Sequence, residues 1–306
     1  MLPSPGDFFS VMYHYVRPKE LSNLRYLEIQ DFQKQIDFFE EKFGLVTKVD
    51  WEKFRETGQK PKGALLTFDD GLKDHYKFVR PILLERNIFA ILYTCTNPLQ
   101  NLALPVHLTH YLLANNEVQI IWDGLADRGL PKQYKKIFDD KSRLAYINQD
   151  HSYLEKELKK LINWATEDIG QKNLLLDIFI EFTNLTQNQF INLWYLSDLE
   201  ILEMNSNGFE IGSHTCSHRL MSNLTHFEID SELYFSKNIL SDICKTNIKS
   251  FCFPFGGNSS YNSNVLAKLE DHGYSESFSV NPQPIKDKFL NPVHRFVLPR
   301  YDCNLF

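Results

Sequence analysis

Short apolar runs alternate with segments of helical periodicity along most of the chain. These runs predict six strands, at 8–14, 63–68, 89–94, 208–213, 249–254 and 275–280. Strands that alternate with helices are typical of βα units around a mainly parallel sheet or barrel. We therefore expect an α/β fold in which the carboxyl ends of the strands meet on one side.

Three helices are indicated by signals at their ends. Residues 31–43 place their apolar side chains on one helical face and stop at Gly44, a residue suited to the end of a helix. Two further helices begin with capping boxes, in which a hydroxyl residue is followed three positions later by a glutamate. These boxes start at Ser197 and Thr225, and they flank the segment "IGSHTCSH".

The middle of the chain, about 100–195, has a different composition. It is polar and rich in Asn, Lys and Asp, and it carries apolar residues at helical spacing, namely Leu154, Leu158, Leu161 and Ile162. Its length far exceeds the roughly 2–6 residues of an ordinary βα or αβ loop. We expect one domain over 1–306 with a helical insertion at about 100–195, which is either a lid over the site or a small subdomain.

Charge and cysteine content exclude several classes of protein. The formal net charge is -6 and no sustained basic run is present, which argues against a nucleic-acid partner. No stretch reaches the roughly 18 apolar residues of a transmembrane segment, and the first residues have neither a basic region nor a long apolar region. Five cysteines, odd in number and scattered, fit free thiols. We expect a cytoplasmic protein, and no oligomeric state is indicated.

Two polar clusters directly follow predicted strands. Asp69 and Asp70 come after the strand 63–68, and His214 and His218 come after the strand 208–213. An isolated Asp-Asp-Gly is most often a turn that caps a helix. Two histidines four residues apart suit one metal ion, however, because a helical turn would point both imidazoles the same way. Two nitrogens and one carboxylate oxygen would leave positions for water and substrate, as in a catalytic metal site.

These motifs also carry a family resemblance. "LLTFDDG" and "IGSHTCSH" resemble the first and second motifs of the polysaccharide deacetylase (NodB-homology, carbohydrate esterase) family. Further similar segments are "VMYHYV", "FCFPFGG", "HGYSESFSV" and "LPRYD", so that the resemblance covers roughly 8–98 and 193–302. It implies a distorted (β/α) barrel of the NodB-homology type, with the helical insertion outside the resemblance.

The resemblance assigns roles to four of these residues. It implies that Asp70, His214 and His218 are the metal ligands and that Asp69 is the general base that takes a proton from the attacking water. A divalent ion makes the second carboxylate tolerable, and it lowers the pKa of a water from about 15.7 to near 7. We expect one divalent ion, in the first place zinc, although such a site also accepts Co, Ni, Mn or Fe.

The resemblance also implies a substrate-side loop. In "FCFPFGG", Pro254, Phe255 and Gly256 correspond to the family's Pro-aromatic-Gly motif. The backbone N–H of Phe255 is the implied donor to the oxyanion that forms when water attacks the acyl carbonyl. Tyr15, Phe255 and Tyr301 are the aromatic residues near predicted strand ends, and they are our candidates for stacking on a sugar.

The chain departs from the family pattern in two places. Cys252 stands where many members have an arginine that braces the base, and the C-terminal Leu-x-His motif that supplies a general acid is not evident. We expect His14, after the first strand, to be the acid, with His294 in reserve. The alternative for each is a histidine that only packs or hydrogen-bonds at the end of an element. Arg300 either orients the site from the last strand or pairs with an acid on the surface.

These observations define a hypothesis about function. We expect a metal-dependent hydrolase that removes an N-acyl group, in the first place acetyl, from an amino sugar in a glycan or a sugar-linked precursor. One alternative keeps the fold and changes the bond, as in a deformylase or a cyclic amide hydrolase. Another is a catalytically weak carbohydrate-binding protein that retains the metal site.

Overall fold

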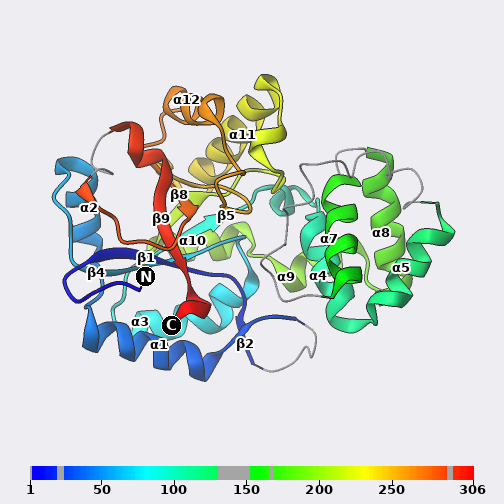
Figure 1. Cartoon of the computed structure of the whole chain (residues 1–306), viewed down its shortest axis with the longest axis horizontal. Coiled ribbons are helices and arrows are strands. Elements are labelled where there is room, and N and C mark those ends of the chain that lie inside the picture. The colour runs from blue at the N-terminus through cyan, green and yellow to red at the C-terminus, as the bar shows by residue number, and fades with distance from the viewer. Residues whose placement is uncertain (1, 19–23, 130–151, 166–168, 288–291) are drawn as a thin grey trace. The chain divides into compact units, whose positions relative to one another are not determined.

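Seven parallel strands close into a barrel in the computed structural model of the chain (Figure 1), which describes residues 2–18, 24–129, 152–165, 169–287 and 292–306. In order around the barrel they are β1 (Phe8–Tyr13), β4 (Gly63–Phe68), β5 (Ala90–Thr94), β6 (Glu210–Ser213), β7 (Ser250–Cys252), β8 (Glu276–Val280) and β9 (Leu298–Asp302). Every neighbouring pair is parallel, and β9 pairs back with β1. The predicted α/β barrel is therefore confirmed, with strands at all six positions that the apolar pattern indicates.

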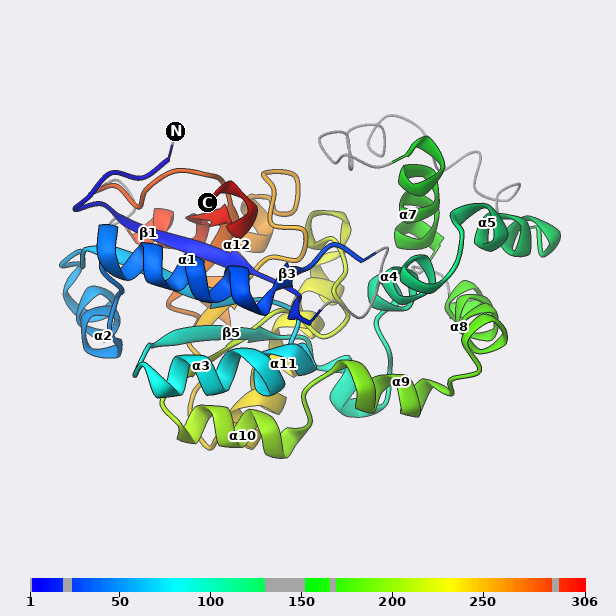
Figure 2. The same cartoon turned by 90° about the horizontal axis from the view of Figure 1, so that it is seen from below.

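Helices cover the outside of the barrel. They are α1 (Ile29–Lys42), α2 (Lys48–Thr57), α3 (Arg80–Glu85), α10 (Asp198–Ser206), α11 (His226–Cys244) and α12 (Ser263–Asp271). Figure 2 shows α1, α3 and α10 running alongside the strands. Both predicted capping boxes are present, because Ser197 and Thr225 each accept a backbone N–H and the partner glutamate closes the box. A short parallel pair, β2 (Val16–Arg17) and β3 (Leu27–Glu28), lies outside the barrel sheet.

Side chains along β4 alternate between two apolar clusters. Ala64, Leu66 and Phe68 pack in a cluster that also contains the buried face of α1. Leu65 packs in a second cluster with Trp51 and other residues. Because neighbouring residues of a strand point to opposite faces, Thr67 and Asp69 continue the face of Leu65. The strand thus delivers Asp69 to the inside of the barrel.

The contacts divide the chain into two units. The barrel unit comprises Met1–Pro18, Tyr26–Gln100 and Trp194–Phe306, and the other unit comprises Lys19–Arg25 and Asn101–Leu193. Helices of the second region are α4 (Pro105–Asn115), α5 (Val118–Asp127), α7 (Tyr153–Ala165), α8 (Ile169–Thr183) and α9 (Gln187–Trp194). The predicted helical character of this region is confirmed.

Within the second unit, α4 packs against α7 and α8. Leu158, one of the residues at helical spacing, is buried in α7. The side chains of Leu161 and Ile162 lie outside the described residues. None of the described helices is both long and apolar enough to cross a membrane.

Candidate active site

The acidic pair occupies the carboxyl end of β4. The N–H of Asp69 donates to the carbonyl of Tyr13 at 3.0 Å, so the chain keeps its strand direction through this residue. Asp70 and Gly71 then both adopt a left-handed backbone, with φ of 77° and 68°. This turn separates the two carboxylates, and both remain buried, at 2% and 4% exposure. Gly71 is required here, since a Cβ would lie 2.7 Å from the Thr94 side chain.

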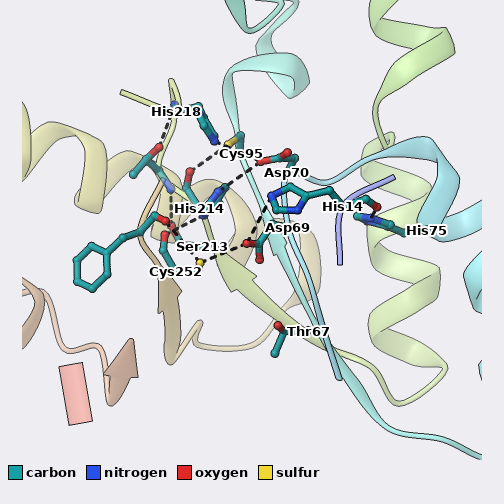
Figure 3. A network of polar contacts seen from close by, with 12 residues as sticks. His14, Thr67, Asp69, Asp70, His75, Cys95, Ser213, His214, His218 and Cys252 are labelled. Atoms are coloured by element: carbon teal, nitrogen blue, oxygen red, sulfur yellow. Dashed lines mark hydrogen bonds and ion pairs between the residues drawn. The ribbon is translucent and has the colours of Figure 1, made fainter. Parts of the chain in front are cut away.

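Asp70 faces the two histidines (Figure 3). Its Oδ1 lies 3.3 Å from Nε2 of His214 and 3.4 Å from Nε2 of His218. Nδ1 of His214 donates a hydrogen bond to the carbonyl of Cys252 at 2.8 Å, so the other ring nitrogen, Nε2, is the one that faces Asp70. The structure therefore brings together the three residues that the family resemblance implies as metal ligands.

The path between the histidines differs from our expectation. No helical turn follows β6; residues 214–220 form an irregular loop in which Thr215 and His218 have left-handed backbones, with φ of 66° and 58°. The expected helical turn is wrong because these two residues reverse the chain locally. The imidazoles converge through this loop conformation, which a count of residues does not reveal.

The donor set fits a divalent metal ion. One oxygen of Asp70 and one nitrogen of each histidine lie within 4.8 Å of one another. Imidazole nitrogens and a carboxylate oxygen are ligands of zinc and similar ions, and three protein ligands leave positions open for water and substrate. The hydrogen bond from His214 to a backbone carbonyl is the kind of contact that fixes the orientation of a metal ligand.

Asp69 forms a buried ion pair with Arg300. Nη1 and Nη2 of the guanidinium lie 2.8 Å from Oδ1 and Oδ2 respectively, and Arg300 is fully buried. Burial raises the pKa of Asp69, but the charge and hydrogen bonds of Arg300, together with His214 and His14, outweigh burial and hold the pKa below its usual range. Of the two alternatives for Arg300, surface pairing is therefore wrong, because the partner is the proposed base.

Cys252 completes this arrangement. Its Sγ lies 2.8 Å from Nη2 of Arg300. Asp69, His214 and Cys252 form a second group whose atoms are close enough to hold a metal. The guanidinium of Arg300 contacts both Asp69 and Cys252, however, and its positive charge disfavours a cation there. Asp70, His214 and His218 are thus the better metal site.

His14 follows β1 and lies beside Asp69. Its Nε2 is 4.0 Å from Oδ2 of Asp69, and its side chain is 40% exposed. The buried His75 donates from Nε2 to the carbonyl of His14 at 2.9 Å, as Figure 3 shows. Burial lowers the pKa of His75 despite this hydrogen bond, so the ring is neutral at pH 7. His14 is thus accessible to a ligand, and its backbone is held in place.

A second contact fixes the same segment. Arg17 donates two hydrogen bonds to Asp74, at 2.8 and 2.7 Å, and both side chains are buried. The Arg17 guanidinium also lies over the rings of Tyr15 and Trp194. These contacts tie the residues after β1 to the residues after the acidic pair.

The Pro-aromatic-Gly loop follows β7. Phe255 and Gly256 both have left-handed backbones, with φ of 64° and 66°. Among the residues that the structure describes, none accepts a hydrogen bond from the N–H of Phe255. Phe255 is 40% exposed, and the centroid of its ring lies 5.0 Å from the centroid of the His218 ring, edge to face. Pro254 is buried. The loop therefore leaves this backbone donor without a partner in the described chain and packs the Phe255 ring against His218.

Two residues proposed from the sequence do not contribute to this description. Tyr301 is fully buried in the apolar cluster that also contains the buried face of α1, so its proposed stacking on a sugar is wrong. The side chain of His294 lies outside the described residues.

Two residues beside the site were missed, namely His75 and Glu232. His75 carries no distinctive sequence signal. Glu232 does, because it interrupts the buried stripe of α11, which contains Ile229, Leu233, Ser236 and Leu240. A glutamate on the buried face of a helix needs a specific partner.

Comparison with known proteins agrees with the motifs. The family model described as polysaccharide deacetylase matches residues 178–277, which include both histidines and the loop of Phe255. This match confirms the resemblance to the polysaccharide deacetylase family. No curated protein matches the chain in sequence.

Solved structures share the fold at low sequence identity. The deacetylase PplD of Streptococcus pyogenes, in complex with acetate, has 14% identity and a TM-score of 0.59, over 98% of this chain and 93% of that chain. The BpsB deacetylase domain of Bordetella bronchiseptica has 13% identity and a TM-score of 0.55, over 98% of each chain. A de-N-acetylase from Aggregatibacter actinomycetemcomitans has 12% identity and a TM-score of 0.55, over 96% and 94%. At these identities the comparison establishes the barrel fold.

Proposed function

We propose that the protein is a metal-dependent hydrolase that removes an N-acyl group, in the first place acetyl, from an amino sugar. The observation that carries this proposal is the division of labour between adjacent carboxylates. Asp70 faces the two histidines, whereas Asp69 faces Arg300 and His14. A site that only bound metal would have no use for a second buried carboxylate, whereas a hydrolase needs a base.

Asp70, His214 and His218 would hold the divalent ion. When bound, such an ion activates a water and polarises the acyl carbonyl of the substrate. Asp69 is the base that accepts the proton of the attacking water. The pKa of Asp69 is below its usual range, so its carboxylate is ionised and able to accept a proton at neutral pH.

Two further groups would act on the substrate. The N–H of Phe255 donates to the oxyanion, and a fixed backbone donor of this kind contributes more in a desolvated site than in water. His14 protonates the leaving amine, which departs poorly without a proton. Its exposure of 40% leaves it accessible to the substrate, and its contact with Asp69 places it beside the base.

The substrate we propose is an N-acylated amino sugar in a glycan or a sugar-linked glycan precursor. Its acetyl group follows from the family resemblance and from the solved deacetylases with the same fold. We propose zinc as the ion and the cytoplasm as the compartment, where the five unpaired thiols would be stable. We also propose one domain over 1–306 with the helices of about 100–195 as an insertion.

The test is amine release by protein reconstituted with Zn²⁺. N-acetylated sugars, nucleotide sugars and chitooligosaccharides are assayed with the wild type, Asp69→Asn and His218→Ala, and metal content is measured on each preparation. Asp242→Asn and His226→Ala change exposed residues of α11 and serve as controls. We expect Asp69→Asn to keep metal and lose turnover, and His218→Ala to lose both.

Three results would count against the proposal. If His218→Ala binds metal as well as wild type, His218 is not a ligand and the proposed metal site is wrong. Metal binding without turnover of any acetylated sugar would favour the carbohydrate-binding alternative, and preference for an N-formyl sugar would favour the deformylase.

A further inference from the structure

A carboxylate from α11, that of Glu232, holds one side of the loop between His214 and His218. Oε2 of Glu232 accepts the N–H of Cys216 at 2.7 Å and the N–H of Ser217 at 3.0 Å. Its other oxygen accepts the hydroxyl of Ser217. Glu232 is only 8% exposed, so these bonds form largely away from water. Three donors from two consecutive residues thus satisfy one buried carboxylate.

The loop needs such support because its backbone is strained. Thr215 and His218 lie on either side of these two residues. Both have left-handed backbone conformations, which residues other than glycine rarely adopt. The carbonyls of Thr215 and Cys216 accept the N–H groups of Thr96 and Asn97, at 3.2 and 2.9 Å. Those bonds hold the loop through its carbonyl groups. Glu232 holds it through the N–H groups of Cys216 and Ser217.

The two histidines depend on the loop to different extents. His214 is anchored independently of the loop, since its N–H donates to Thr94 at 3.1 Å and its ring donates to Cys252. His218 comes after the loop, and its N–H donates to Oγ1 of Thr215 at 3.0 Å. A change in the loop would therefore displace His218 more than His214.

Glu232 has no other evident role. In the described part of the chain, its carboxylate forms no ion pair with a Lys or Arg. It also belongs to neither of the two groups of side chains that are close enough to hold a metal ion. The negative charge is instead stabilised by backbone and hydroxyl donors of the loop.

We propose that Glu232 is a positioning residue that sets the affinity of Asp70, His214 and His218 for a divalent ion by fixing the loop before His218. The inference rests on the proposed function, because it requires that these three residues bind metal. Contacts that orient metal ligands typically change metal affinity by about 10–100-fold when they are removed.

The experiment measures Zn²⁺ affinity by competition with a chromophoric chelator, and the visible absorption of the Co²⁺-substituted protein. Glu232→Ala is expected to weaken Zn²⁺ binding by about 10–100-fold and to change the Co²⁺ spectrum. Glu232→Gln keeps an oxygen that accepts both N–H groups, and its amide can donate to Ser217, so its affinity should remain within about tenfold of wild type. Asp242→Asn, on an exposed position of the same helix, is the matched control.

The thermal midpoint of each metal-free protein separates positioning from stability alone. A lower midpoint for Glu232→Ala with wild-type Zn²⁺ affinity would overturn the inference. If Glu232→Ala does not fold, Glu232→Asp replaces it, because a side chain shorter by one methylene cannot keep all three bonds; wild-type affinity in that variant would also overturn it. The His214→Ala variant tests the underlying site. If it binds Zn²⁺ as tightly as wild type, the proposed function fails, whatever the result for Glu232.

Discussion

Arg300, on the last strand of the barrel, donates two parallel hydrogen bonds of 2.8 Å to the carboxylate of Asp69 at the end of β4. The pair lies 231 positions apart in the chain and is almost completely buried. The family resemblance led us to expect an arginine at the position of Cys252. Here the guanidinium comes from β9, and it contacts the thiol of Cys252 as well as Asp69, the proposed base.

Removal of Arg300 should therefore destabilise the protein. Arg300→Gln leaves a buried carboxylate without its counter-charge, and breaking a buried pair in this way costs about 3–5 kcal/mol. Arg300→Lys keeps the positive charge but cannot form both parallel hydrogen bonds, so it should lower the free energy of unfolding by less than Arg300→Gln does. Urea unfolding of both variants measures the difference. Arg86→Gln, which breaks an exposed pair with Asp37 and Glu40, is the control and should change stability by less than about 1 kcal/mol. Equal effects at the two sites would contradict this prediction.

The role of His14 can be tested through the leaving group. An amine needs a proton to depart, whereas a nitrophenolate does not. His14→Gln should therefore lower turnover of an N-acetylated sugar by about 10²–10⁴-fold, with little effect on hydrolysis of a nitrophenyl acetate. Asp69→Asn should lower both rates, because the water needs its base in either reaction. Parallel losses for His14→Gln on the two substrates would indicate that His14 acts on something other than the leaving group.

Gly256 should not tolerate a side chain. Its φ is 66°, and a Cβ would lie 2.3 Å from Cγ2 of Val280. Gly256→Ala should cost about 1–3 kcal/mol in the free energy of unfolding, because the added atom overpacks a buried turn. It should also lower turnover with metal content unchanged, since the adjacent N–H of Phe255 shifts. Gly257→Ala is a neighbouring control, as no atom lies within 4 Å of the Cβ it would add. Denaturant midpoints that fall equally in both variants would refute the argument.

The capping box of α11 predicts a pH-dependent contribution to stability. Hydrogen bonds from the N–H and hydroxyl of Thr225, together with Arg219, lower the pKa of Glu228 from 4.5 to about 2. The stabilisation is therefore complete above about pH 5 and is lost as pH falls towards 2. At pH 6, Glu228→Gln should unfold at a lower urea concentration than wild type, because its free energy of unfolding is smaller by about 1 kcal/mol.

The difference between wild type and Glu228→Gln should disappear near pH 2. Urea midpoints across this range measure it, with Glu270→Gln, on the exposed side of α12, as the control. A difference that stays constant with pH would show that the carboxylate charge plays no part in the cap.

The sequence predicts much of the fold because its signals there are local. The period-two alternation of β4 determines that Thr67 and Asp69 point inward, and the boxes at Ser197 and Thr225 mark helix starts through contacts three residues apart. The proposed ligands are also recognisable, because each follows a strand and parallel strands end on the same side of the barrel.

Contacts between distant segments were not predictable in this way. Closure of the barrel brings Arg300 to Asp69, and no pattern around either residue indicates the other. The loop from His214 to His218 depends on left-handed residues that sequence spacing does not reveal, so the expected helical turn was wrong. Glu232 was detectable only as an acid on an apolar stripe, and its partners belong to another element.

The place of β9 in the barrel also has a consequence for the order in which the protein matures. β9 pairs with both β8 and β1, and it carries the guanidinium that neutralises Asp69. A ribosome completes the first six strands of the barrel before it adds this one. Until β9 inserts, the emerging chain has two unpaired strand edges and an acid without the guanidinium that pairs with it, so barrel closure and assembly of the proposed catalytic centre become the same event.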